Sequence, residues 1–333
     1  MERRTDFCIC CRKERPYLLK KTTVIQEIRE RKYEFAITSA VCSVCGNEMN
    51  PPGLIDQNAE EIDRQYRSAE NIIGISEIEK LLAMYNIGKA PLSLALGFGE
   101  VTISRYLAGQ IPSKEYSDIM RHALVSAEYM EELLNRNRTK IGETAYRKAV
   151  IAAKELNHLY APLSAKLKAV IAYIFSCVQE ITPLMLQKIL YYIQGVYVAL
   201  YDAELFPEEC EAWVHGPVYR NVYMLFKDFK FNPIDDDRFS LLEGYLFDLS
   251  DPERTVIDNV INSFGIYSGK TLESITHKEK PWLDAREGYV DDQPSCEVIT
   301  KTSMKTYFKA VNEKFRIGSE VGLKGYVEHM LSV

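Results

Sequence analysis

Residues 182–201 decide the fold of the C-terminal half: Thr-Pro-Leu-Met-Leu-Gln-Lys-Ile-Leu-Tyr-Tyr-Ile-Gln-Gly-Val-Tyr-Val-Ala-Leu-Tyr. Thr182 is a residue type that caps helices, and Pro183 suits a first helical turn, where no backbone N–H has to be bonded. The apolar side chains that follow lie nearly all round the expected helix, a pattern typical of a buried helix. We therefore expect a long helix over 184–201 as the buried centre of a helical domain.

The segments on both sides of this helix also favour a helical domain. Residues 167–175 place apolar side chains on one helical stripe, and Gly216-Pro217 reads as a turn into a helix over 219–229. No nucleophile or carboxylate cluster stands at a spacing that matches His215 or His277, so we interpret both as hydrogen-bonded structural histidines. The sequence also lacks a Walker loop and a dinucleotide glycine fingerprint, and we expect no enzyme.

Three short signatures in this half resemble a known family. They are Leu-Gln-Lys-Ile-Leu-Tyr-Tyr-Ile-Gln-Gly over 186–195, Glu-Ala-Trp-Val-His-Gly-Pro-Val over 211–218 and Leu-Glu-Ser-Ile-Thr-His-Lys-Glu-Lys-Pro-Trp over 272–282. Their order and spacing resemble the Panacea domain of SocA-like antitoxins, over about residues 165–315. The resemblance implies a mainly helical domain that binds and neutralises a toxin encoded beside it, although some relatives deliver a toxin to a protease instead.

Aromatic side chains are the first candidates for contacts with such a toxin. Trp213 and Trp282 are the only tryptophans, and each could be either a core anchor or an exposed anchor of an interface. We expect exposed aromatic residues in and around the first two signatures. The candidate toxin-binding residues are Tyr191, Tyr192, Trp213, Tyr219 and Tyr223.

A helix-turn-helix is expected upstream of this half. Apolar residues at 75, 78, 81, 82 and 85 fall on one helical face, and a second short helix ends at the turn Gly97-Phe98-Gly99. The third expected helix, over 100–107, buries Ile103 and Tyr106. The segment 95–112 resembles the DNA-binding unit of the Cro/C1 repressor type.

In such a unit the early residues of the second, recognition helix meet base edges in the major groove. The candidate DNA-binding residues are Glu100, Thr102, Ser104 and Arg105. Because the segment is nearly charge-balanced, we expect modest affinity per monomer and a homodimer that reads two half-sites. A three-helix core without a DNA role is the alternative.

The first fifty residues carry two C-x-x-C pairs, which stand thirty residues apart. Two such pairs let four thiolates surround one tetrahedral ion and leave no position open for catalysis. We expect structural Zn²⁺ bound by Cys8, Cys11, Cys42 and Cys45. Between the pairs, alternating apolar and polar residues over 32–41 predict a small sheet.

Other interpretations of the cysteines remain open. Cys10 could replace Cys11 as a ligand, and the four cysteines could instead be unmetallated core residues. Cys177, Cys210 and Cys296 lack pairing partners and are interpreted as core residues.

The zinc module and the helix-turn-helix together resemble the two-domain layout of MqsA-type antitoxins. The predicted fold class is mainly α and multidomain, and α+β overall. The expected order is a zinc-binding β module (1–50), a connecting helix (51–71), a helix-turn-helix domain (72–134), a linker helix (135–160) and a Panacea-like domain (161–333).

The net charge of −6 argues against a protein covered with nucleic-acid-binding charge, but it is compatible with a local basic patch. No apolar run reaches the roughly 20 residues of a membrane helix and no signal peptide is recognisable, so we expect a cytoplasmic protein without membrane contact. We predict a type II antitoxin that binds a cognate protein toxin and represses its own operon at operator DNA. The alternatives are a stand-alone regulator of a phage or mobile element and a proteolytic adaptor.

Overall fold

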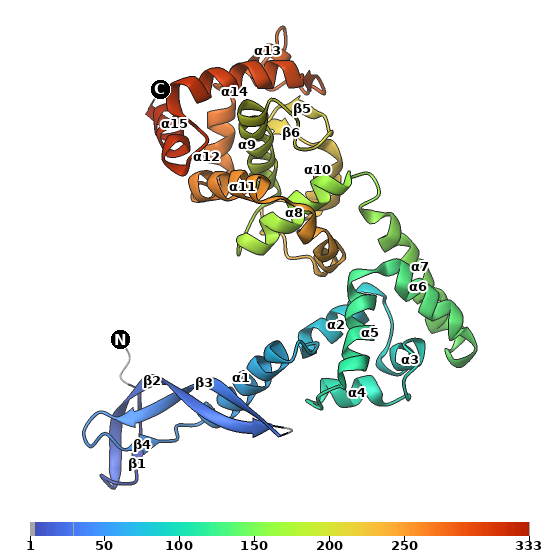
Figure 1. Ribbon diagram of the computed structural model, residues 1–333, viewed down its shortest axis with the longest axis vertical. Coiled ribbons are helices and arrows are strands. Elements are labelled where there is room, and N and C mark those ends of the chain that lie inside the picture. Colours follow the sequence, from blue (N-terminus) through green and yellow to red (C-terminus); the bar gives the residue numbers. More distant parts are fainter. Residues whose placement is uncertain (1–3, 29, 333) are drawn as a thin grey trace. The chain divides into compact units, whose positions relative to one another are not determined.

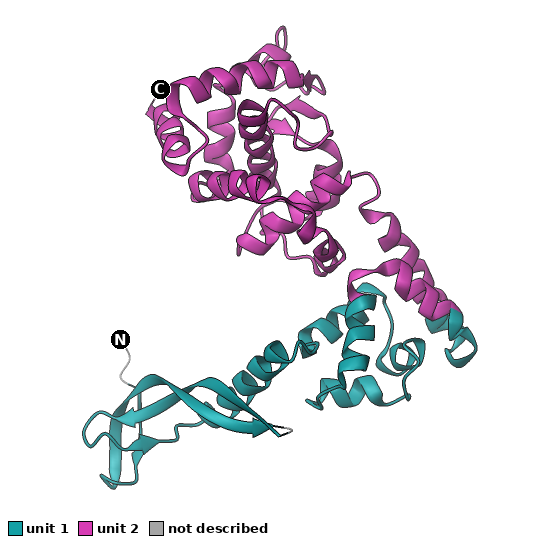
Figure 2. Cartoon of the chain, in the orientation of Figure 1, with its two compact units in different colours: residues 1–123, 136–146 teal, residues 124–135, 147–333 magenta. Residues whose placement is uncertain are grey.

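The computed structural model describes residues 4–28 and 30–332, and the chain divides into two compact units (Figure 2). The first unit is Met1–Ala123 with Arg136–Tyr146, and the second is Leu124–Asn135 with Arg147–Val333. A small antiparallel sheet stands at the N-terminal end and helices dominate the rest (Figure 1), which confirms the predicted fold class. Among the described residues, no helix is both long enough and apolar enough to cross a bilayer.

Residues 5–28 and 30–125 form a sheet followed by helices. The strands are β1 (Thr5–Cys8), β2 (Lys13–Ile28), β3 (Arg31–Cys42) and β4 (Glu48–Met49), and the helices are α1 (Leu54–Ala69), α2 (Ile75–Met84), α3 (Lys89–Ala95), α4 (Thr102–Leu107) and α5 (Lys114–Val125).

The sheet is antiparallel throughout, in the order β1-β2-β3-β4. β2 and β3 form a long hairpin whose register runs from Tyr17 opposite Cys42 to Ile28 opposite Arg31. On one face of this hairpin, Phe35 is buried and packs in one apolar cluster with Tyr66 of α1. The helix therefore covers that face because the alternation of β3 places its apolar side chains there.

Two amide side chains of α1 close the outer edge of β3. Asn58 accepts a hydrogen bond from the backbone N–H of Thr38 at 2.9 Å and donates one to the carbonyl of the same residue at 2.8 Å. Gln65 makes the same pair of bonds with Ala36, at 2.9 and 2.8 Å. We call these four bonds the amide clamp. It satisfies backbone groups that an unpaired strand edge would leave open.

The rest of the chain is mainly helical. Its elements are α6 (Ala127–Arg136), η1 (Arg138–Lys140), α7 (Glu143–Leu159), α8 (Ala165–Cys177), α9 (Pro183–Tyr201), β5 (Cys210–Trp213), β6 (Gly216–Val218), α10 (Arg220–Phe226), η2 (Lys227–Phe229), η3 (Asp237–Asp248), α11 (Asp251–Phe264), α12 (Gly269–Thr276), α13 (Lys280–Ala285), β7 (Val298–Ile299), α14 (Lys301–Phe315) and α15 (Glu320–Ser332).

The helix expected at the centre of the C-terminal half is α9. Thr182 caps it, since its hydroxyl accepts a hydrogen bond from the Met185 N–H at 3.3 Å, and Pro183 occupies its first turn. Side chains are buried on all sides of this helix over most of its length. The prediction of a long, buried central helix is therefore confirmed.

The packing around α9 is aromatic. The ring of Tyr192 stacks on Phe264 of α11 with 3.9 Å between ring centroids, and Tyr191 meets Phe308 of α14 edge-on at 5.5 Å. A Cβ at Gly195 would lie 2.3 Å from the ring of Phe308. The missing side chain at this position therefore lets α14 approach the central helix closely.

The structure corrects the expected turn at Gly216-Pro217. Both residues lie in β6, which pairs with β5 in a hairpin and forms an edge of the small sheet β6-β5-β7. Gly216 has φ +91, a conformation that favours glycine, and Pro217 is tolerated because an edge strand need not donate on both sides. The helix that follows is also shorter than the predicted 219–229, because α10 covers Arg220–Phe226 and a 3₁₀ turn replaces its last residues.

Candidate functional site

Four cysteines meet at the open end of the β2–β3 hairpin. The sulfur atoms of Cys8, Cys11, Cys42 and Cys45 all lie within 4.8 Å of one another. Tetrahedral ligands held about 2.3 Å from a central ion are separated by distances of this order. The geometry therefore suits a metal ion bound by four sulfurs, and the sulfur of Cys11 belongs to the group, whereas Cys10 is exposed.

Backbone N–H groups contact two of the four sulfurs. The N–H of Val44 lies 3.4 Å from the sulfur of Cys42, and that of Cys11 lies 3.5 Å from the sulfur of Cys8. Hydrogen bonds from the backbone of Cys45 and Val44 lower the pKa of Cys42 to about 6, although burial opposes this shift. A thiolate is the form that binds a metal.

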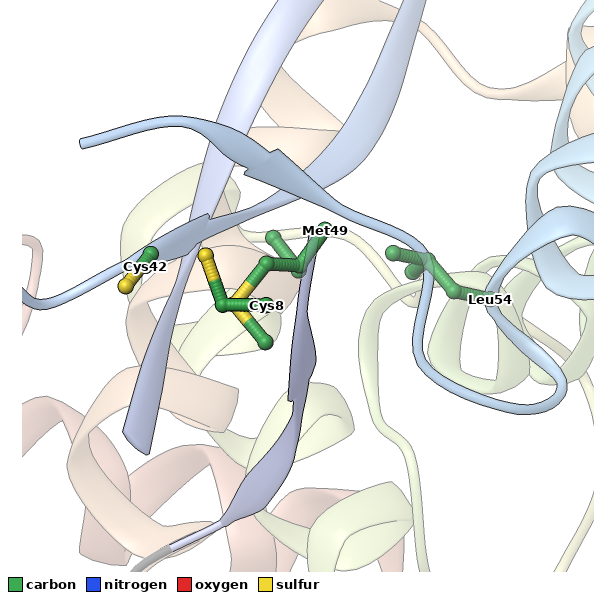
Figure 3. Close-up of a cluster of buried hydrophobic side chains, with 5 residues drawn as sticks. Cys8, Cys42, Met49 and Leu54 are labelled. Atoms are coloured by element: carbon green, nitrogen blue, oxygen red, sulfur yellow. The ribbon is translucent and has the colours of Figure 1, made fainter. Parts of the chain in front are cut away.

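The ligands are also part of a small core. Cys8 and Cys42 are buried together with Ala40, Met49 and Leu54 (Figure 3). Two of the five members of this cluster are thus metal-ligand candidates. Ala40, Met49 and Leu54 are its other three members, and small modules with few core residues commonly depend on a bound metal.

The remaining cysteines differ in part from expectation. Cys210 is buried, as predicted, but Cys177 and Cys296 are exposed. The interpretation of these two as core residues was wrong. Position in an apolar sequence did not decide burial, because Cys177 is the last residue of α8 and Cys296 lies in the loop before β7.

In the segment expected to be a helix-turn-helix, α3 and α4 are joined by a tight turn. The buried hydroxyl of Ser93 in α3 accepts a hydrogen bond from the Ile103 N–H of α4 at 3.0 Å. Gly97, with φ +80, makes the turn between the helices. Ile103 and Tyr106 are buried, as predicted. The angle between the two helices is therefore held by a buried hydrogen bond and by an apolar contact face.

The candidate DNA-binding residues lie on the outer side of this pair of helices. Glu100, Ser104 and Arg105 are exposed and Thr102 is half-buried. The structure corrects one detail, because α4 begins at Thr102 and Glu100 stands in the turn before it. Ser104 and Arg105 are consequently the candidates that project from the helix itself into solvent.

In the C-terminal half, the three signatures converge on a buried lysine. Lys188 of α9 is fully buried, and its ammonium group donates a hydrogen bond to the Pro217 carbonyl of β6 at 3.0 Å. A Cβ at Gly216 would lie 2.7 Å from the Thr276 hydroxyl of α12 and 2.8 Å from the Lys188 nitrogen. Burial lowers the pKa of Lys188 to about 7. The first signature thus holds the second directly against the third.

A buried carboxyl group lies at the other end of the third signature. Glu279 is 0% exposed and accepts hydrogen bonds from the hydroxyls of Tyr192, at 3.1 Å, and Tyr326. Burial raises its pKa to about 7, against the effect of the tyrosine hydroxyls. This side chain joins α9 to α15 and is a structural element of the core.

A third ionisable group of the signatures reaches the surface. Glu273 is almost completely buried, and Lys270 at 2.6 Å and His215 at 3.3 Å contact one of its oxygen atoms from the solvent side. Burial opposes ionisation of this carboxyl, but the side-chain contacts with Lys270 and His215 together lower its pKa. His215 is therefore tied to the third signature while its own side chain stays 69% exposed.

An aromatic and charged cluster lies beside His215 on the β5–β6 hairpin. The ring of Trp213 meets Tyr223 of α10 edge-on, with 4.9 Å between centroids, and the guanidinium of Arg220 lies 5.5 Å from the Trp213 ring. Glu211 joins them, because Trp213 Nε1 and Arg220 both donate hydrogen bonds to it at 2.7 Å. We call Glu211, Trp213, Arg220 and Tyr223 the tryptophan cluster.

The structure corrects three of the candidate toxin-binding residues. Tyr191 and Tyr192 are 0% exposed and Tyr219 is 1% exposed, so the expectation that they are surface aromatics was wrong. The reason is that α9 is enclosed on all sides and that the N-terminal end of α10 packs on Phe206. Trp213 and Tyr223 are half-buried and remain accessible.

Trp282 is a core anchor. It is 7% exposed, and its Nε1 donates a hydrogen bond to the Trp213 carbonyl at 2.9 Å. His277 stacks on its ring with 4.1 Å between centroids. The third signature thus packs against the hairpin, while Trp213 and His215 of the second signature reach the surface.

Sequence reasoning missed Lys188, Glu279 and Arg220. Lys188 had a usable signal, since it lies in a helix that was predicted to be buried all round. Glu279 stands between two lysines in the sequence, which indicates a solvated turn rather than a core position. Arg220 lies two residues after the second signature and carried no local sign of its contact with Trp213.

Comparisons with known proteins extend to one part of the chain. No curated protein and no solved structure matches it. The resemblance of the N-terminal half to MqsA-type antitoxins has no corresponding family match and stays a prediction. Residues 186–283 match the family described as antitoxin SocA-like, Panacea domain. All three signatures fall inside this segment, and residues 186–283 are therefore similar to an antitoxin SocA-like Panacea domain.

Proposed function

We propose that this protein is the antitoxin of a type II toxin-antitoxin system. Its second unit binds and neutralises a cognate protein toxin, and its first unit binds operator DNA and represses the shared operon. The observation that carries the proposal is the family match over residues 186–283. Within it, Lys188 of the first signature and Trp282 of the third both donate hydrogen bonds to the backbone of the β5–β6 hairpin. Occlusion of the toxin by an interface of roughly 1,600 Å² would suffice for tight inhibition.

The tryptophan cluster is the proposed centre of the toxin-binding surface. Tryptophan, tyrosine and arginine are the residue types that most often dominate interface energies. Here one of each lies in the same cluster, and Glu211 fixes the Trp213 ring and the Arg220 guanidinium by hydrogen bonds. Side chains fixed before binding lose little conformational entropy when a partner arrives.

Zn²⁺ is the proposed occupant of the four-sulfur site. Zinc prefers tetrahedral sites, and four thiolates without an open position make a structural site. The bound ion would stabilise the sheet to which the amide clamp joins α1. Its role is therefore to hold the fold of the first unit and not to take part in a reaction.

Operator binding is assigned to α4, with Arg105 and Ser104 toward the DNA and with Thr102 and Glu100 at the start of the helix. Side chains of these types read base edges or contact phosphates. A single short helix makes few contacts, so we expect the protein to bind as a homodimer over two half-sites about 34 Å apart.

Co-expression tests the antitoxin assignment. Full-length protein produced together with the product of the directly adjoining gene should restore growth. Tyr223→Ala should weaken the complex by roughly thirtyfold, as expected for an interface hot spot. The matched control is Phe247→Ala, which removes an 86% exposed aromatic residue elsewhere in the second unit and should still protect. If the folded wild-type chain protects against no neighbouring gene product, the assignment is wrong.

Operator binding is tested by titration of the promoter DNA at several salt concentrations. Arg105→Ala should reduce the affinity, with Lys227→Ala as a control of equal charge change in the second unit. Binding that weakens with salt, and to the same degree in both variants, would indicate non-specific attraction. Specific binding combined with no protected toxin would favour the stand-alone regulator instead.

A further inference from the structure

The two outer edges of the hairpin β2–β3 are not equivalent. On β3, Asn47 bonds Cys42, β4 pairs with Ala40, and the amide clamp takes the next positions. On β2, the N–H of Tyr17 donates to the Arg4 carbonyl at 3.1 Å. Beyond Tyr17, no strand among residues 4–28 and 30–332 pairs with this edge of β2.

The register shows which backbone groups point outward along this edge. The Pro16 carbonyl accepts a hydrogen bond from Ser43, so the even-numbered residues of β2 bond toward β3. Bonding alternates along an antiparallel strand, and the odd-numbered residues therefore turn their N–H and carbonyl groups away from β3. Between positions 20 and 28 these are Lys21, Thr23, Ile25 and Glu27, and all four side chains are exposed.

The outer edge of β2 has the features of a strand that pairs with another strand. Ile25 is β-branched, apolar and 65% exposed, and Val24 and Ile28 beside it are only half-buried. A long, regular edge strand with such side chains is a template for another strand unless something covers it. Proline residues and β-bulges commonly block such an edge, and residues 17–28 of β2 contain neither.

We propose that this edge pairs with the same edge of a second copy of the chain, antiparallel, with Val24 facing Val24 of the second copy. In this register Lys21 faces Glu27 of the second copy, and Glu27 faces its Lys21. Thr23 faces Ile25 in the same way. All outward groups between positions 20 and 28 then find partners, because each facing pair exchanges two backbone hydrogen bonds.

The charges of Lys21 and Glu27 favour this register and favour a second copy of the chain as the partner. A shift of the twofold axis to Thr23 places Lys21 opposite Ile25, and a shift to Ile25 places Glu27 opposite Thr23, so neither alternative pairs opposite charges. In the proposed register the remaining pairs are Lys20 with Ile28 and Thr22 with Gln26, and like charges never face each other. A strand that complements itself about its own centre fits a twofold-symmetric contact.

This inference deepens the proposed function and rests on it in one respect, since it supplies the homodimer that operator binding requires. The two can still be separated by experiment. Dimer formation is measured without DNA, and operator binding is measured with it. A dimer held by this edge that ignores its promoter would refute only the operator assignment.

Charge exchange in the full-length protein tests the register. Sedimentation equilibrium gives the dimer dissociation constant. Lys21→Glu and Glu27→Lys should each raise it by about tenfold or more, because each places like charges in two facing pairs. The double variant with both exchanges should return the constant to near the wild-type value. The control Lys20→Glu has the same charge change as Lys21→Glu, but its proposed partner is apolar, and it should have little effect.

A backbone variant tests the edge itself. Thr23→Pro removes an N–H that points away from β3, so the hairpin keeps its ladder while the second strand loses a donor. The variant should be monomeric, with an unchanged circular dichroism spectrum and metal content. A wild-type chain that stays monomeric at high concentration overturns the proposal. The proposal is also overturned if Thr23→Pro and Lys21→Glu both remain dimeric, or if Thr23→Pro remains dimeric and loses only toxin binding.

Discussion

The four-cysteine module and the helical core around α9 hold their backbones together by different means. In the module, ligand candidates make up two of the five members of the core cluster beside the four-cysteine site. Around α9, the apolar packing is extensive enough to enclose a lysine and a glutamate. A module with so few apolar core residues is expected to depend on a bound ion, whereas the larger core around α9 offsets the cost of burying ionisable groups.

The largest expected effect comes from removing one metal ligand. Cys42→Ser should unfold the sheet, because the ion is expected to contribute on the order of 10 kcal/mol to a module of this size. The helical core should stay folded. Both tryptophans, Trp213 and Trp282, lie in the second unit, so their fluorescence reports only on that unit, while bound zinc is measured directly.

Cys10→Ser is the matched control for this variant. Cys10 is exposed and its sulfur lies outside the group of four, so the substitution should keep one zinc per chain. Equal zinc content in Cys42→Ser and Cys10→Ser would contradict the proposed ligand set. A shift of the unfolding transition followed by tryptophan fluorescence on loss of metal would contradict the independence of the helical core.

A second test concerns the buried glutamate. The pKa of Glu279 is raised by burial from 4.5 to about 7, so between these values the folded state binds a proton that the unfolded state lacks. The associated stability is fully present below pH 4.5 and is lost as the pH rises to 7, by roughly 3 kcal/mol. Glu279→Gln should remove this dependence in denaturant titrations followed by tryptophan fluorescence.

Lys188→Met is the control for the glutamate. Burial lowers the pKa of Lys188 from 10.5 to about 7, so its contribution changes only between pH 7 and 10.5. The methionine variant should therefore keep the slope between pH 4.5 and 7. An identical loss of that slope in both variants would show that the pH dependence does not come from Glu279.

The smallest effect is expected at Gly216, where the second signature meets the first and third. Gly216→Ala should destabilise the second unit by about 2 kcal/mol, because the new Cβ overlaps neighbouring atoms and the residue keeps a positive φ. Gly288→Ala shares the strain, with φ +89, but nothing lies within 4 Å of its Cβ. Equal destabilisation in both variants would mean that the contact with Thr276 and Lys188 has no energetic weight.

Local chemistry was readable from the sequence, and tertiary context was not. The cysteine pairs and the start of α9 at Thr182-Pro183 were predicted because spacing and capping act within a few residues. The exposure of Tyr191 and Tyr192 was mispredicted because the elements that cover them, α11 and α14, are distant in sequence. The β5–β6 hairpin was missed for a similar reason, since β7, which completes its sheet, lies more than eighty residues away.

The amide clamp fixes how two positions of α1 align with β3. Asn58 and Gln65 project from the same side of the helix because seven residues make nearly two full turns, and their targets on β3 are two residues apart. One residue inserted between them would rotate the second amide by about 100° away from the strand. An insertion between Asn58 and Gln65 is therefore expected to break one half of the amide clamp, whereas an insertion after Gln65 leaves the spacing of the two amides unchanged.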